Sequence, residues 1–213
     1  MALGQPFDSL SPVNAVIVAP LIEESAKALV FLWLIGSRHF DNATDGFVYG
    51  AAVGLGFAMS ENLGYFLLYA DSSALQFAAV IAVRTLYSAL MHACASSLIG
   101  AALGHTRFRR RGERLLALAF GAALALGVHA LWNGLLVLGN DTHPSPYAFI
   151  NLIVFPIEFA IVFVIFQMSL ALEQRTMRKE LAAEAVRGTI PTAHVAVLTS
   201  YRRRSRPGWV PAH

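Results

Sequence analysis

The sequence predicts an all-α fold, a polytopic transmembrane helix bundle of about five spans. Hydrophobic residues make up 56% of the chain and charged residues 14%, and the mean hydropathy is +0.57. Soluble domains are about 25% charged, so this composition favours a membrane protein. A helix needs about 20 apolar residues to cross the hydrocarbon core of a bilayer. Five runs are long enough: 12–35, 46–70, 75–103, 115–138 and 147–171.

The first two runs have distinct sequence features. Residues 12–35 follow neither a basic leader nor a clear cleavage motif, so we expect a retained span rather than a secretory signal. The connection 37–45 contains Asp-Asn-Ala-Thr-Asp, which supplies capping residues for the second helix. Gly50, Gly54 and Gly56 recur on that helix. Small residues allow close helix packing, so we expect the second span to be central. Ordinary glycine tolerance in a membrane helix is the alternative.

Basic residues predict the topology. Of sixteen Lys and Arg residues, five lie between Arg107 and Arg114 and eight between Arg175 and Arg206. By the positive-inside rule, both segments are cytoplasmic, which places the N-terminus outside and the C-terminus inside. We therefore expect residues 1–172 to form the membrane bundle and 173–213 a basic cytoplasmic tail, helical as far as Arg187. Juxtamembrane basic clusters attract anionic lipid, and no nucleic-acid-binding fold is apparent.

Charged residues in the first span are the strongest functional signal. An ionisable group in a membrane span costs about 2.5–3.5 kcal/mol on insertion scales, so its presence suggests function. Glu23, Glu24 and Lys27 are spaced so that the lysine reaches either carboxylate on one helix. The two carboxyl groups are expected to titrate as a coupled pair, which suits acid–base chemistry. A buried ion pair that only fixes helix register is the structural alternative.

The next three spans carry further polar groups. Arg84 is expected to neutralise a neighbouring glutamate such as Glu158. His129 and Asn133, one helical turn apart, form a plausible donor pair for a developing oxyanion. The polar candidates in these spans are Glu61, Asn62 and Tyr65 on the second, Arg84, Ser88 and His92 with Tyr87 and Ser96 close to them on the third, and His129 and Asn133 on the fourth.

The cysteine content excludes several kinds of site. Cys94 is the only cysteine, so neither an internal disulfide nor a thiolate zinc cluster can form. No base lies beside Cys94 in sequence, and we do not expect it to act as a nucleophile.

Four strings together resemble the PrsW family of intramembrane proteases, which is related to the CAAX prenyl proteases and the abortive-infection proteins. The strings are APLIEESAK, GFAMSENLGY, the His92 segment MHACASS and HALWNG. The resemblance implies an all-helical membrane fold and peptide-bond hydrolysis within or near the membrane, with anti-sigma factors as substrates in some bacteria.

The resemblance also implies roles for individual residues. Glu23 would activate water as general base, with Glu24 and Lys27 shaping its charge. His92 would help to hold that water, while His129 and Asn133 would stabilise the oxyanion. Glu61 and Asn62 match a family string without a clear role. The candidate catalytic residues are Glu23, Glu24, Glu61, His92, His129 and Asn133, and the supporting residues are Lys27 and Asn62.

The cofactor question stays open at the level of sequence. Glu23, Glu61, His92 and His129 are suitable ligands for zinc or another divalent ion. No HExxH or other compact ligand pair is present, and each ligand would come from a separate helix. We therefore favour water activation by glutamate, with a divalent metal as the alternative.

Three functions fit these observations. The first is an endopeptidase that cuts a membrane-associated protein in the bacterial plasma membrane. The second is an ion or proton-relay transporter, and the third is a non-catalytic membrane scaffold. At about 1.5 Å rise per residue, Glu23, Glu61 and His129 lie about 14–17 Å from the outer ends of their spans. Clustering at one depth favours the endopeptidase, because a relay would spread such groups across the bilayer.

Overall fold

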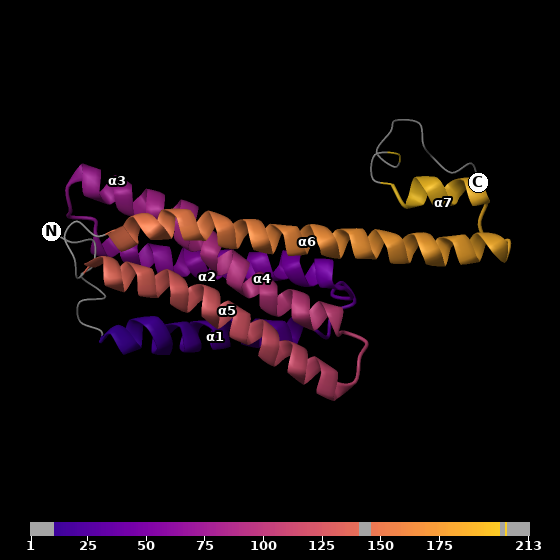
Figure 1. Cartoon of the computed structure of the whole chain (residues 1–213), viewed down its shortest axis with the longest axis horizontal. Coiled ribbons are helices and arrows are strands. Elements are labelled where there is room, and N and C mark those ends of the chain that lie inside the picture. Colours follow the sequence, from indigo (N-terminus) through magenta and orange to yellow (C-terminus); the bar gives the residue numbers. More distant parts are fainter. Residues whose placement is uncertain (1–10, 141–145, 201–202, 204–213) are drawn as a thin grey trace. The chain divides into compact units, whose positions relative to one another are not determined.

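The computed structural model describes residues 11–140, 146–200 and 203, whose regular segments are all helical (Figure 1). The chain divides into two compact units, Met1–Ile165 and Phe166–His213. The predicted all-α fold is confirmed. In chain order the elements are η1 (Asn14–Val18), α1 (Ala19–Leu34), α2 (Ala43–Leu68), α3 (Ala74–Val83), η2 (Arg84–Ser88), α4 (Ala89–His105), α5 (Arg111–Asn140), α6 (Pro146–Val186) and α7 (Thr192–Leu198), where η denotes π-helix.

The helices follow the five predicted apolar runs closely. η1 continues directly into α1, and α3, η2 and α4 form one unbroken helix. The fifth predicted span, 147–171, is the first part of α6, and the helix expected after residue 173 is the continuation of α6 to Val186. The division between compact units also falls within α6, after Ile165. Arg202, Arg204 and Arg206 of the predicted basic tail lie outside the described residues.

Four helices of the described chain are long and apolar enough to cross a membrane. They are Ala43–Leu68, Ala74–His105, Arg111–Gly139 and Ile150–Val186. The helix formed by η1 and α1, which corresponds to the first predicted span, 12–35, is not one of these four, and its three charged residues set it apart in composition. Large apolar side chains such as Trp33, Met59 and Leu67 are 80%, 76% and 69% exposed. Such surfaces suit a lipid environment, and the chain is an integral membrane protein.

Polar side chains begin two of the helices. Asn42 precedes α2 and accepts a hydrogen bond from the backbone N–H of Asp45 at 2.9 Å. Ser73 does the same for α3, accepting from the N–H of Gln76. The predicted capping segment before the second span is therefore confirmed.

The centre of the first unit is α4, not the second span as predicted. Every residue from Met91 to Gly100 on α4 is buried, whereas α2 exposes one face. The close approach of these two helices is as expected at Gly50 and Gly54, where an added Cβ would collide with the α4 backbone. Gly56 has nothing within 4 Å of such a Cβ. The glycine pattern on α2 therefore correctly predicts a tight helix contact, but α4, the helix that α2 contacts there, is the more buried of the two.

Candidate active site

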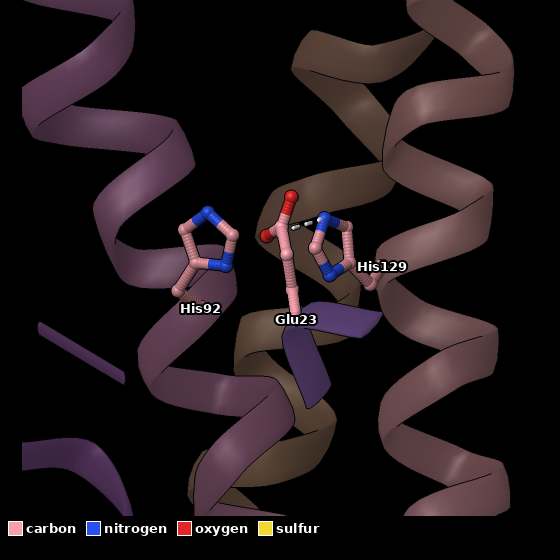
Figure 2. Close-up of side chains that lie close together, drawn as sticks. All are labelled: Glu23, His92 and His129. Carbon is pink, nitrogen blue, oxygen red and sulfur yellow. Dashed lines mark ion pairs between the residues drawn. The ribbon is translucent and has the colours of Figure 1, made fainter. Parts of the chain in front are cut away.

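Three helices direct ionisable side chains toward one place (Figure 2). Glu23 comes from α1, His92 from α4 and His129 from α5, and one ligand-type atom of each lies within 4.8 Å of the others. The two imidazole rings meet edge to face with their centroids 4.8 Å apart. Both histidines are at most 2% exposed, whereas the Glu23 side chain is 21% exposed. The structure thus brings together three of the predicted site residues.

Glu24 fixes the proton position on His129. Oε1 of Glu24 lies 2.7 Å from Nζ of Lys27 and 2.8 Å from Nδ1 of His129. A carboxylate paired with an ammonium group is ionised and can only accept hydrogen bonds. Nδ1 of His129 therefore carries a proton, and in the neutral imidazole Nε2 presents its lone pair toward Glu23, whose Oε2 is 3.7 Å away.

Glu61 fixes the proton position on His92 in the same way. Oε2 of Glu61 lies 2.8 Å from Nε2 of His92 and 2.7 Å from Nη2 of Arg84. Because Glu61 is paired with the guanidinium, it is the acceptor and Nε2 of His92 is the donor. Nδ1 of His92 then accepts from Nζ of Lys27, at 2.8 Å.

Lys27 connects the two halves of this network. Its side chain is almost fully buried, and its ammonium group bonds to Glu24 and His92 and lies 4.1 Å from the centre of the Phe57 ring. Glu23 is further away, with 4.0 Å between its Oε2 and Nζ of Lys27. The supporting role expected of Lys27 thus has a specific geometry, since the lysine pairs closely with Glu24 and loosely with Glu23.

Glu23 is the least satisfied member of the cluster. Its Oε2 atom is buried and makes no hydrogen bond within the described part of the chain. Its lone pairs face the bare Nε2 of His129, and two such groups repel unless a proton, a water molecule or a cation lies between them. The three carboxylates Glu23, Glu24 and Glu61 are also opposed by only two permanent cations, Lys27 and Arg84. With neutral histidines the cluster carries one uncompensated negative charge, which favours an added cation or proton.

Arg84 has a different partner from the one predicted. Arg84 does neutralise a neighbouring glutamate, as expected, but its ion pair is with Glu61 and not with Glu158, the example given. Nε of Arg84 donates to Oδ1 of Asn62 at 2.9 Å, and the guanidinium carbon lies 3.9 Å from the centre of the Tyr65 ring. Spacing along the sequence could not identify this pairing, since α2 and η2 meet only in the folded bundle.

Asn133 and Asn62 make their hydrogen bonds to groups other than Glu23, His92 and His129. Nδ2 of Asn133 donates to the backbone oxygen of Ala15 at 2.9 Å, and Asn62 bonds to the side chain and carbonyl of Arg84. Asn133 is therefore bonded to the backbone of η1, and its oxyanion role stays a prediction.

Arg84 was not among the candidate site residues predicted from the sequence, although its four-residue spacing from Ser88 and His92 was a usable signal.

The residues that could hold a metal are Glu23, His92 and His129. Glu61, the fourth predicted ligand, is not in this group and instead accepts from His92. Ligands of a tetrahedral zinc ion lie about 3.3 Å apart for bonds of 2.0–2.1 Å, close to the 3.7 Å between Glu23 and His129.

The hydrogen bonds of the two histidines also fit a metal site. Nδ1 of His129 is bonded to Glu24 and Nε2 of His92 is bonded to Glu61, and a metal-bound histidine usually has its second ring nitrogen bonded in this way. The donor set fits a divalent ion, provided that Lys27 moves away from Nδ1 of His92.

Comparison with known proteins decides the family. The family model described as "PrsW family intramembrane metalloprotease" matches residues 3–169, which is most of the chain. The chain belongs to the PrsW family. Its relatives include Protease PrsW of Oceanobacillus iheyensis, 33% identical over 61% of this chain and 57% of that protein. Protease PrsW of Bacillus subtilis is 31% identical over 54% of this chain and 50% of its own length.

The chain spans about half the length of these curated PrsW relatives. No solved structure matches the chain.

Proposed function

We propose that this PrsW-family chain is an intramembrane endopeptidase that hydrolyses a membrane-associated protein in the bacterial plasma membrane. The observation that carries the proposal is the position of Glu23. Its Oε2 atom is buried, lacks a hydrogen bond within the described residues and faces Nε2 of a histidine whose other nitrogen is held by Glu24. This is the arrangement of a general base beside a proton acceptor that a second carboxylate orients.

In this mechanism Glu23 removes a proton from a water molecule, which attacks the carbonyl carbon of the scissile peptide bond. The 3.7 Å between Oε2 of Glu23 and Nε2 of His129 leaves a short path for that proton. Glu24 stabilises the imidazolium form of His129 through Nδ1. The proton on Nε2 of His129 then makes a hydrogen bond to the oxyanion, and His129 transfers this same proton to the leaving amine as the C–N bond breaks.

The remaining residues hold this centre in place. His92 packs edge to face against His129 and bounds the position of the water. Lys27 is held by Glu24 and His92, and its ammonium group lies 4.0 Å from Oε2 of Glu23. In the alternative, metal-dependent form of the site, a divalent ion such as zinc bound by Glu23, His92 and His129 would polarise the carbonyl group and make the water more acidic, and Nε2 of His129 would be a ligand rather than a proton carrier.

Comparative proteomics tests both the activity and the identity of the substrate. Membrane fractions are compared from cells in which the chromosomal gene is deleted and either the wild-type protein or Glu23→Gln is expressed at equal abundance. We expect new peptide termini from one or a few membrane proteins only with the wild type. Glu158→Gln is the matched control, because Glu158 is a partly buried carboxyl residue of α6 outside the cluster. Identical termini with Glu23→Gln and the wild type would contradict the proposal.

A further inference from the structure

The backbone carbonyl of Ala15 lacks a donor from its own helix. In η1 the N–H of Ala19 donates to the oxygen of Asn14, which is the spacing of a π-helix. In an α-helix the N–H of Ala19 would instead donate to the oxygen of Ala15. If the π-helix continued by one residue, the donor to the Ala15 oxygen would be the N–H of residue 20. Residue 20 is proline, which has no N–H. The change from η1 to α1 therefore leaves the Ala15 oxygen without a helical partner.

Asn133 supplies the missing donor from another helix. Its Nδ2 atom lies 2.9 Å from the Ala15 oxygen, and both residues are buried. The next residue on α5 is Gly134, where an added Cβ would lie 3.7 Å from a methyl group of Val16. α5 thus runs close to η1 at this point. An unpaired carbonyl in hydrocarbon is costly, so this single bond matters to the packing of the two helices.

The bond also lies next to the candidate catalytic residues. On α5, Asn133 is one turn after His129, and on the first helix Pro20 precedes Glu23 by three residues. Two hydrogen bonds therefore join the same pair of helices: Asn133 to Ala15 and His129 to Glu24. The bond from Asn133 to Ala15 sets the position of η1 and α1 along α5. The bond between His129 and Glu24 depends on that position.

We propose that Asn133 is a positioning residue: it replaces the N–H that Pro20 removes and so fixes the register of α1 against α5. Its effect on the relative position of Glu23 and His129 rests on the proposed function, whereas its effect on helix packing does not. This role differs from the oxyanion contact predicted from sequence, which requires the amide to face the substrate.

A double-mutant cycle tests this role. The variants are Asn133→Leu, Pro20→Ala and the double variant, each compared in thermal midpoint in detergent and in cleavage rate. We expect Asn133→Leu to lower the midpoint by several degrees and to slow cleavage by about tenfold or more, because small misplacements of reacting groups are costly. Pro20→Ala provides a backbone N–H at residue 20, so the double variant should recover most of both losses. Cleavage that stays low in the double variant while the midpoint recovers would overturn the proposal and favour direct contact with substrate.

The thermal midpoints separate this proposal from the proteolytic one. If the wild type cleaves nothing, recovery of the midpoint in the double variant still supports the register bond while the proposed function falls. Strictly additive midpoints would overturn the register bond whatever the activity. Asn151→Leu is the matched control, because Nδ2 of Asn151 donates to the backbone oxygen of Trp132 and so joins α6, rather than η1, to the same part of α5. Pro20→Ala should not restore stability to that variant.

Discussion

Oε1 of Glu24 lies 2.8 Å from Nδ1 of His129 and joins α1 to α5, although 105 residues separate the two in sequence. The same oxygen accepts from Lys27 at 2.7 Å. Its neighbour Glu23 has no such bond at Oε2. Adjacent glutamates therefore have different environments: Oε1 of Glu24 orients a histidine although its Oε2 has no hydrogen bond, whereas Oε2 of Glu23 is open to a further partner beside that histidine.

Replacing Glu24 by glutamine should weaken the site without removing its base. The neutral amide holds the His129 imidazolium less well than a carboxylate does, and loss of such an orienting group typically costs 10–100-fold in activity or metal affinity. We expect a fall of about that size in kcat, with KM changed little, and an equal fall in zinc affinity where zinc is bound. Wild-type kcat in Glu24→Gln would contradict the orienting role.

Breaking the ion pair of Arg84 and Glu61 should destabilise the bundle. Both side chains are largely shielded, at 11% and 23% exposed, and removal of one partner from a buried pair costs about 3–5 kcal/mol. We expect Arg84→Met to lower the thermal midpoint markedly, and the Arg84→Met, Glu61→Met double variant to recover part of that loss. Arg38→Met, at an exposed position between α1 and α2, is the control. An unchanged midpoint in Arg84→Met would show that the pair contributes nothing.

The glycine contact between α2 and α4 predicts a contrast between two neighbouring positions. A Cβ at Gly54 would meet the carbonyl group of His92, whereas one at Gly56 meets nothing within 4 Å. We expect Gly54→Ala to lower both the thermal midpoint and activity, because α4 carries His92. Gly56→Ala should be neutral or stabilising by up to about 1 kcal/mol, since alanine favours a helix. Equal effects at both positions would contradict the packing described.

The position of the Lys27 ammonium group predicts that replacing this lysine changes metal binding. Its ammonium group lies 2.8 Å from Nδ1 of His92, the nitrogen that would coordinate an ion. Lys27→Met removes this competing cation, and we expect tighter zinc binding to the solubilised protein, measured by competition with a chelating dye. The control is Lys27→Met with His129→Gln, in which the gain should disappear. Weaker binding in the single variant would show that Lys27 organises the ligands rather than competes for them.

The sequence predicted the helices and most of the clustered residues for identifiable reasons. Apolar runs of membrane length have few alternatives to helix, and charges such as Glu23 and Lys27 stand out against them. Contacts between helices were harder to predict. Arg84 pairs with Glu61 rather than Glu158, because rotation of η2 within the bundle is set by packing and not by composition. The contact of Asn133 depends on a π-helical turn before Pro20, which periodicity does not reveal.

The most direct test is cleavage by the purified protein in liposomes, with the membrane protein found by proteomics as substrate. Wild type, Glu23→Gln and Glu158→Gln are compared at equal incorporation and with the same supply of zinc. Loss of a general base predicts a fall of about 10²- to 10⁴-fold for Glu23→Gln, and Glu158→Gln should cleave as the wild type does. Cleavage by Glu23→Gln at the wild-type rate would contradict the assignment of Glu23 as the group that activates water.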